Sequence, residues 1–543
     1  MTNLADFSSR RSAVYARDGM VAASQPLAVA AGISILSKGG NAADAAIAVA
    51  AALNVTEPTS TGLGGDCFAL YYEAVTRKVH ALNGSGRAPQ ALTLERLQHE
   101  GFGLNLPRYH PYTITVPGAA AGWCDLLTRF GRLPLSQVLA PAIHLAEEGF
   151  PVAPLTALFW QSGARGQLAS ALNGRELTLD ERGPNGGELF HNLGLAKTLR
   201  TLAESGRDAY YRGPIGEAVV AIVQEAGGCL ALEDLAAHQS TWDDPISTTY
   251  HNLRVWECPP NGQGLAALLA LNLLEGFDLK SSQPLSAQRL HLEIEAMRLA
   301  FADARRWVAD PLFEPAPLAE LLSKDYADHR RRQIDPCQAN PLVGSGQFAS
   351  GSDTVYFCVV DGDGNACSFI NSNYMGFGTG IVPRGWGFSL QNRGHNFSLD
   401  PTHPNHVEPG KRPYHTIIPA MLTREADGSL YAPFGVMGGF MQPQGHTQVL
   451  LGLVEDDLDP QAVLDLPRFC IEPDAPNSQV SLEEGIDVKV MADLAARGHI
   501  VTPISGMGRA MFGRGQIIRR DPISGVLCGG SDPRSDGCAM GLV

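Results

Sequence analysis

Apolar residues along this chain recur in two patterns, at three- to four-residue spacing in some segments and as short continuous runs in others. The first pattern predicts amphipathic helices, and the second predicts buried strands. Helices are expected at residues 25–37, 42–54, 195–204, 215–226, 262–275, 285–307 and about 443–454, and strands at 20–22, 67–72, 78–82 and repeatedly from 354 onward. Helices alternating with strands, and antiparallel hairpins in the C-terminal part, predict an α+β layered fold.

The first two predicted helices are rich in alanine and separated by Gly39-Gly40-Asn41. The glycines are expected to end the first helix. Asn41 is expected to cap the second helix, which carries Asp44 in its first turn.

Two apolar runs flank the turn-forming segment 361–365 and predict a β-hairpin. The turn centres on Asp363, and counting outward from that centre places Thr354 opposite Ser372. Directly opposed residues on paired strands have Cβ atoms roughly 5 Å apart. We therefore expect two hydroxyl groups to lie beside each other at the open end of this hairpin.

Thr354 stands where a loop of small residues, 344–353, meets the first strand of the hairpin. Cutting the Asp353–Thr354 bond would give the threonine a free α-amine, whose pKa lies near ~8. Such an amine can accept the proton of the neighbouring hydroxyl, so that an N-terminal threonine serves as its own nucleophile and base. The β-propensity of threonine also explains an ordinary surface hairpin, and the local sequence leaves both interpretations open.

The whole chain has 543 residues, a net charge of −15, 44% hydrophobic residues and 18% charged residues. Length alone suggests three or four domains. No convincing linker, repeat or low-complexity tract divides the sequence, however, and the composition is that of a large, well-packed globular protein. The negative charge argues against nucleic acid or an anionic membrane as a partner.

The sequence contains neither a recognisable targeting signal nor a complete metal-ligand pattern. Segment 1–11 has no apolar core, and the longest apolar stretch, about 45–55, is too short to span a bilayer. A cytoplasmic location is expected, in which the ten cysteines, without any Cys-x-x-Cys pair, are buried free thiols. His403 and His406 share a loop, but no third ligand accompanies them. We predict no metal and no organic cofactor.

A series of short motifs runs through nearly the whole chain. They are the segments 39–46, 62–66, 116–123, 354–366, 377–380, 410–413, 438–439 and 531–535. In order and spacing they resemble the γ-glutamyltransferase family of N-terminal-nucleophile hydrolases. The resemblance implies a four-layer αββα sandwich and a precursor that cuts itself before Thr354. Cleavage would give a large subunit, 1–353, and a small subunit, 354–543, that remain one interwoven unit, with a dimer of such heterodimers left open.

The resemblance also implies catalytic roles. Thr354 would be the nucleophile, Ser372 would orient it, and the backbone N–H groups of Gly438 and Gly439 would hold the oxyanion. The two glycines follow an apolar strand and precede a helix, a place where paired N–H groups can bind a developing negative charge. A tight strand-to-helix turn that needs glycine is the alternative from sequence alone.

The expected substrate pocket departs from that of γ-glutamyltransferases. Positions that grip the ammonium and carboxylate of a glutamyl unit in the family, or lie near them, here carry Ser85, Tyr374, Arg393, Asn396, His415 and Thr416. Asn396 stands in place of an acid, and a neutral amide gives an ammonium no charge-assisted partner. We expect a substrate whose carboxylate meets Arg393 or Arg87, because arginine suits bidentate carboxylate recognition, and which has no adjacent ammonium.

The predicted function is hydrolysis of a small carboxylate-bearing amide through an acyl-threonine ester. The segments 83–89 and 390–394 resemble the acylase-like branch of the family, which includes oxamate amidohydrolase. Oxamate, cleaved to oxalate and ammonia in purine catabolism, is therefore the expected substrate. One alternative is a γ-glutamyltransferase or glutathione hydrolase with the same nucleophile. Another is a non-catalytic single chain, against which the intact Thr354, Ser372 and Gly438-Gly439 argue.

Overall fold

The computed structural model describes residues 11–340, 354–471 and 479–543. Its centre consists of two seven-stranded sheets. In the first sheet the order is β19 (Cys538–Leu542), β2 (Gly19–Ala23), β10 (Val355–Asp361), β11 (Ala366–Ser372), β3 (Asp66–Glu73), β4 (Lys78–Gly84) and β7 (Thr241–Asp243). In the second it is β1 (Val14–Ala16), β18 (Leu527–Ser531), β17 (Arg514–Arg520), β13 (Leu430–Met437), β12 (Ala420–Arg424), β9 (Leu253–Glu257) and β8 (Ile246–Tyr250). Neighbouring strands within both sheets are antiparallel.

The two sheets pack face to face around an apolar interior. Met20 and Tyr356 from the first sheet share one buried cluster with Met421 and Met437 from the second. The two sheets approach closely at Gly435, where a Cβ atom would lie 2.6 Å from the Tyr356 ring. Glycine is thus required on β13 at this point, next to the strand that begins after Thr354.

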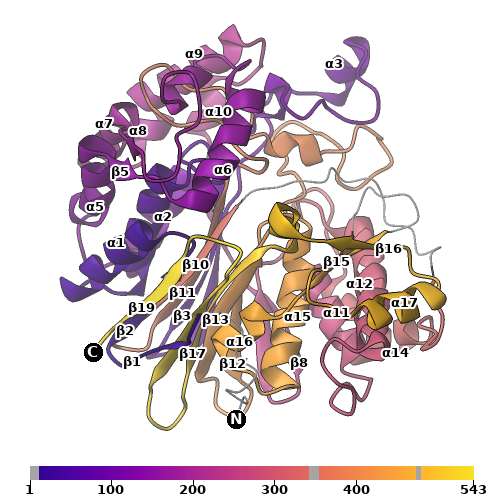
Figure 1. The fold of residues 1–543 in the computed structure, drawn as a ribbon. Helices are drawn as coiled ribbons and strands as arrows, with labels where there is room; N and C mark the ends of the chain where they lie inside the picture. The colour runs from indigo at the N-terminus through magenta and orange to yellow at the C-terminus, as the bar shows by residue number, and fades with distance from the viewer. Residues whose placement is uncertain (1–10, 341–353, 472–478) are drawn as a thin grey trace.

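Helices cover the outer face of each sheet and complete a four-layer αββα sandwich (Figure 1). One layer is built on α1 (Pro26–Ser37), α2 (Ala42–Thr56), α5 (Leu135–Glu148) and α7 (Leu193–Ser205). The other is built on α11 (Gly264–Leu274), α12 (Ala287–Trp307) and α15 (Met441–Val454). Asn41 caps α2 together with Asp44, as the sequence predicts, and α2 is buried along its whole length because small alanines let it lie between α1 and the sheet.

The remaining helices and strands surround this sandwich. The helices are α3 (Leu94–His99), α4 (Ala119–Phe130), α6 (Pro154–Gly163), α8 (Asp208–Tyr211), α9 (Pro214–Glu225), α10 (Leu232–Ala236), α13 (Leu318–Leu321), α14 (Lys324–Arg331), α16 (Pro460–Asp465) and α17 (Val488–Ala496). The strands are β5 (Phe150–Pro151), β6 (Leu189–Phe190), β14 (Phe469–Ile471), β15 (Val480–Glu483) and β16 (Val501–Ile504). The α+β prediction and its main elements are confirmed, with boundaries shifted by a few residues at most.

The parts of the chain before and after Thr354 are interwoven. Each of the two sheets takes strands from both parts: β2, β3, β4 and β7 join β10, β11 and β19, while β1, β8 and β9 join β12, β13, β17 and β18. Separating the two parts would therefore expose the edges and the core of both sheets.

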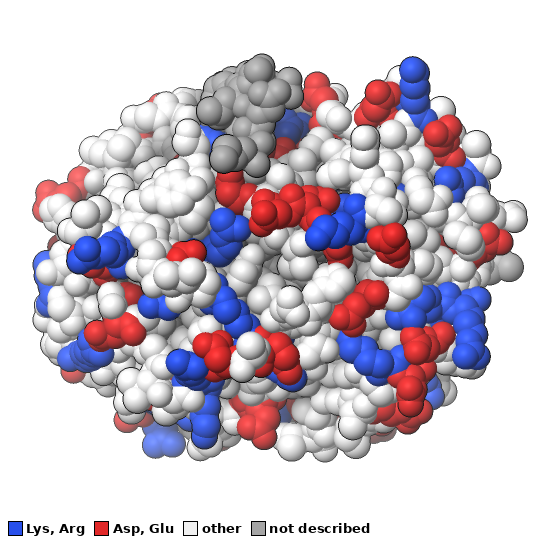
Figure 2. All heavy atoms as spheres, turned by 90° about the horizontal axis from the view of Figure 1, so that it is seen from below, with Lys and Arg blue, Asp and Glu red and all other residues white. Residues whose placement is uncertain are grey.

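The surface carries charges of both signs. Lysine and arginine side chains alternate with aspartate and glutamate side chains over the described part of the face in Figure 2. Of the helices in the described ranges, none combines the length and apolar character needed to cross a membrane.

Candidate active site

The hairpin of β10 and β11 places Thr354 against Ser372. The ladder pairs Val355 with Asn371, and one step further outward Thr354 faces Ser372, as the turn count predicts. The Thr354 Oγ1 and Ser372 Oγ atoms lie 3.0 Å apart, and both residues are fully buried. The register follows from the turn, whose Asp361 carboxylate accepts the N–H groups two and four residues ahead and so fixes its length.

The Ser372 hydroxyl is held by two further donors. The backbone N–H of Tyr374 donates to Ser372 Oγ at 2.9 Å, and Nη2 of Arg393 donates to the same oxygen at 3.2 Å. Tyr374 has a φ of 80°, a left-handed conformation that is rare for a bulky residue and typical of functional sites. This conformation lets Tyr374 reach Ser372 with its N–H while its ring lies under the guanidinium.

Arg393 is the buried cation of the site. Its Nη1 donates to Thr416 Oγ1 at 2.7 Å, and its guanidinium carbon lies 4.3 Å from the centre of the Tyr374 ring. Burial lowers the pKa of Arg393 to about 10, which still leaves the group charged at neutral pH. Its Nε is buried and has no partner among the described residues. A desolvated cation with an unused donor is a ready site for an anionic ligand.

Asn396 closes the side of the site beyond Tyr374. The Tyr374 hydroxyl donates to Asn396 Oδ1 at 2.5 Å, and Asn396 Nδ2 donates to the carbonyl of Tyr414 at 2.9 Å. Both ends of the amide are thus engaged by protein groups, and the position offers no negative charge to a ligand.

His415 forms a fully buried pair with Asp66, with 3.0 Å between Nε2 and Oδ2. Burial and the nearby Arg393 lower the pKa of His415 to about 3, so the imidazole is neutral and carries its proton on Nε2. Burial opposes ionisation of Asp66, but the hydrogen bond from His415 and the charge of Arg393 outweigh it and keep the pKa of that carboxyl below its usual range. Asp66 is therefore the anion that balances Arg393.

The carboxylate of Asp66 has all its partners within the protein. Oδ1 accepts the N–H groups of Gly86 and Gly118 and the Nε2 amide of Gln391, each at 3.0 Å, while Oδ2 accepts a hydrogen bond from the Nε2–H of His415. A carboxylate with four donors has little capacity left for the ammonium of a substrate.

Gly438 and Gly439 lie between the end of β13 and the start of α15, as expected. Their φ values are 138° and 60°, which only glycine adopts without strain. Gln263 ties this turn to the rest of the site, because its Nε2 donates both to the carbonyl of Gly439 at 2.8 Å and to the carbonyl of Thr416 at 2.7 Å. The predicted oxyanion turn and the Arg393 group thus share one rigid network.

Arg87 is placed differently from Arg393. It pairs with Asp310, at 3.1 Å between Nη1 and Oδ2, and donates to the carbonyl of Gly410. Ser85 is buried, and its hydroxyl accepts the amide of Asn261 at 3.1 Å. Asp353, the residue before the predicted cut, lies outside the described residues.

Sequence reasoning assigned no role to Asp66, Gln263 or Tyr414. Asp66 stands in the motif 62–66, and a carboxylate within an otherwise small and apolar motif was the available signal. Gln263 and Tyr414 bond to each other through Oε1 and the phenol at 3.0 Å. They are separated by 151 positions in the chain, and nothing in the local sequence marks them as partners.

Comparison with known proteins shows the family to which this chain belongs. A family model described as gamma-glutamyltranspeptidase matches residues 28–542. The chain belongs to this family. It is 36% identical to the "Glutathione hydrolase-like YwrD proenzyme" of Bacillus subtilis and 34% identical to the "Oxamate amidohydrolase proenzyme" of Klebsiella pneumoniae, in both cases over 96% of this chain and 98% of the relative.

A solved structure gives the same fold. The cephalosporin acylase of Bacillus halodurans superimposes with a TM-score of 0.91 at 46% identity and covers 99% of this chain and 98% of its own. Within the family, γ-glutamyltranspeptidases, acylases and amidohydrolases are hydrolases that share the N-terminal-nucleophile fold. The expected αββα sandwich is therefore that of an N-terminal-nucleophile hydrolase.

Proposed function

We propose that this chain is the precursor of an amidohydrolase that cuts itself before Thr354 and then uses Thr354 as its nucleophile. The observation that carries the proposal is the buried hydroxyl pair of Thr354 and Ser372, 3.0 Å apart, with the guanidinium of Arg393 bonded to one member. The names of the relatives support the proposal, because they describe proenzymes. The products of cleavage would be the subunits 1–353 and 354–543.

In the processed enzyme the chemistry follows from the new terminus. Thr354 Oγ1 attacks the amide carbonyl while the α-amine, with a pKa near ~8, accepts the hydroxyl proton. The N–H groups of Gly438 and Gly439 stabilise the negative charge on the carbonyl oxygen. The C–N bond then breaks, the α-amine passes its proton to the leaving ammonia or amine, and water hydrolyses the acyl-threonine ester to a carboxylate and the free threonine.

The substrate we propose is a small amide with a carboxylate, and oxamate is its simplest representative. Arg393 supplies a buried positive charge with a free Nε donor for the carboxylate. Asp66, the carboxylate whose charge acts on Arg393, already accepts hydrogen bonds from four protein donors, and Asn396 is neutral and engaged at both ends. The pocket thus favours an anion and leaves an adjacent ammonium without a partner. Arg87 is the weaker candidate for the carboxylate because Asp310 already neutralises it.

A second candidate function is hydrolysis of glutathione or transfer of its γ-glutamyl group. It is favoured by the 36% identity to a protein named glutathione hydrolase-like. The nucleophile would be the same, and only the pocket distinguishes the two. A non-catalytic chain is disfavoured by the buried and mutually bonded Thr354, Ser372 and Arg393, which a scaffold has no need to keep.

The test is release of ammonia from oxamate by freshly purified protein, compared with release of aniline from a γ-glutamyl anilide under the same conditions. The account predicts turnover of oxamate and a much lower kcat/KM for the anilide. Comparable values for both, or turnover of the anilide alone, would favour the γ-glutamyl alternative.

A further inference from the structure

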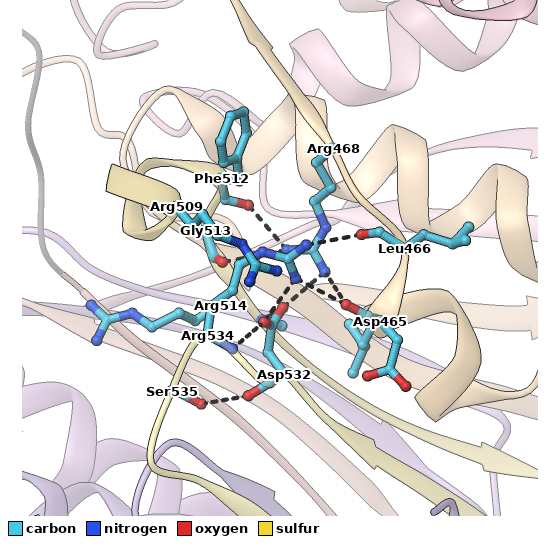
Figure 3. A network of polar contacts seen from close by, with 12 residues as sticks. Asp465, Leu466, Arg468, Arg509, Phe512, Gly513, Arg514, Asp532, Arg534 and Ser535 are labelled. Carbon is cyan, nitrogen blue, oxygen red and sulfur yellow. Dashed lines mark hydrogen bonds and ion pairs between the residues drawn. The ribbon is translucent and has the colours of Figure 1, made fainter. Parts of the chain in front are cut away.

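A buried ionic network lies next to the turn that holds Gly438 and Gly439. Its core is the carboxylate of Asp532, which accepts Nη2 of Arg468 at 2.8 Å and Nη1 of Arg534 at 3.0 Å (Figure 3). Glu483 adds a second carboxylate, with its Oε1 2.7 Å from Nε of Arg534. All of these side chains are buried, and Glu483 also accepts Nε of the more exposed Arg509 at 2.8 Å. The proposed reaction makes no use of any of them.

Arg468 reaches beyond this network to a backbone turn. Its Nη1 donates to the carbonyls of Phe512 and Gly513, at 3.0 and 3.3 Å, as Figure 3 shows. The opposite side of the guanidinium remains on Asp532. The planar fork of an arginine is what allows one side chain to clamp a carboxylate and a turn at the same time.

The turn held by Arg468 lies directly against the proposed oxyanion turn. A Cβ atom on Gly513 would lie 2.5 Å from the carbonyl oxygen of Met437, and a Cβ atom on Gly438 would lie 3.1 Å from Cα of Gly513. Gly513 has a φ of 74°, a conformation that favours glycine. The two turns are therefore in backbone-to-backbone contact, and a shift of one displaces the other.

Asp532 also holds strand β17, which lies beside strand β13. Its Oδ2 accepts the N–H of Gly515 at 2.9 Å, and Gly515 is paired with Val436 in the ladder between β17 and β13. Strand β13 ends at Met437, so the network holds the strand that leads directly into the Gly438 turn. The hydrogen bonds of the Arg468 guanidinium go to Asp532, to the carbonyl of Leu464 and to the Phe512–Gly513 turn.

We propose that Arg468, anchored by Asp532, is a positioning residue for the N–H groups of Gly438 and Gly439. It acts through the Phe512–Gly513 turn and sets the direction in which these donors point. The assignment rests on the proposed function, since it supposes that the two glycines hold the oxyanion. It adds a determinant of turnover that has no part in binding substrate.

The test uses Arg468→Met, the milder Arg468→Lys, and Arg289→Met as the matched control. Arg289 is also buried and also paired with an aspartate, Asp456, at 2.7 Å, and none of its described hydrogen bonds reaches the turn at Gly513. The Lys variant keeps the charge beside Asp532 but loses the fork, and it serves where the Met variant does not fold.

Two readouts are taken on the full chain. The first is hydrogen exchange of the backbone amides in peptides that cover residues 438–441, measured by mass spectrometry. We expect faster exchange in both Arg468 variants and unchanged exchange in Arg289→Met. The second is steady-state hydrolysis of an amide that the wild type cleaves. Removing an oxyanion donor outright costs about 10²–10³ in kcat, so displaced donors are expected to lower kcat on the order of tenfold or more, with little change in KM.

The outcomes distinguish a failure of the positioning role of Arg468 from a failure of the proposed function. Unchanged exchange at 438–441 in the Arg468 variants, or a fall of kcat no larger than in Arg289→Met, would overturn the positioning role. A wild type that is not cut before Thr354 and hydrolyses no amide would instead refute the proposed function. The exchange measurement needs no activity and would still decide whether Arg468 controls the Gly438 turn.

Discussion

Replacing Arg393 by methionine should abolish the preference for a carboxylate-bearing amide. Methionine keeps much of the length and apolar bulk of the arginine stem but removes the fork that reaches Thr416 and Ser372. It also removes the unpartnered Nε that we propose for the substrate carboxylate. Asp66 keeps its own four donors in this variant, so no carboxylate is left without hydrogen bonds.

The magnitude follows from the kind of bond that is lost. A hydrogen bond to a charged group contributes about 1.5–3 kcal/mol, which corresponds to a factor of about 10–150 in kcat/KM. The loss of the contact with Ser372 slows every substrate equally and therefore cancels in a ratio. The quantity to measure is the ratio of kcat/KM for oxamate to that for oxamide, its neutral counterpart of nearly the same shape, with ammonia release as the assay.

The matched control is Arg87→Met, because Arg87 is an arginine of the same region, with a side chain 25% exposed, that is already paired with Asp310. We expect the oxamate-to-oxamide ratio to fall by about 10–150-fold in Arg393→Met and to stay near the wild-type value in Arg87→Met. An unchanged ratio in Arg393→Met, or a collapse of the ratio in Arg87→Met, would show that the carboxylate is bound elsewhere.

Three further predictions follow from single contacts. Ser372→Ala removes the hydroxyl that is hydrogen-bonded to Thr354 Oγ1, and the loss of this one bond should slow self-cleavage on the order of tenfold. Denaturing gels follow the cleavage, and a wild-type rate in the variant would contradict the role of Ser372. Asp66→Asn leaves His415 without its anionic partner and should lower the melting temperature of the protein, whereas an unchanged melting temperature would contradict the structural account of this pair. His238 is buried and stacked on Tyr211, and burial together with Arg412 lowers its pKa to about 3, against about 6.5 in the unfolded chain. Between these two pKa values the unfolded state binds a proton that the folded state does not, so the stability of the wild type falls as pH falls. His238→Phe keeps an aromatic ring without the titrating group, and its free energy of unfolding relative to wild type should rise by about 2 kcal/mol from pH 6.5 to pH 5 in denaturant titrations. A difference that stays constant with pH would refute the assignment.

The hairpin that carries the proposed nucleophile could be predicted in full because its register depends on local sequence alone. A turn of fixed length between two apolar runs determines which residues face each other, and Thr354 meets Ser372 as the count requires. The cap of α2 by Asn41 is local in the same way.

The pocket could be predicted only in part, because its contacts join distant segments. The pairing of Arg87 with Asp310 spans 223 positions and that of Asp66 with His415 spans 349, and neither is encoded in a motif of its own. From sequence, Arg87 and Arg393 were equal candidates for the carboxylate. Burial and the partners already present in the fold are what distinguish them.

The most direct test of the central claim is intact mass spectrometry of the purified protein, alone and quenched during turnover of the amide. The account predicts two fragments, the smaller one beginning at Thr354 and carrying the acyl mass on that residue in the quenched sample, while Thr354→Ala remains one uncut chain of 543 residues. A Thr354→Ala protein cut at the same bond, or an acyl group found on another residue of the wild type, would contradict it.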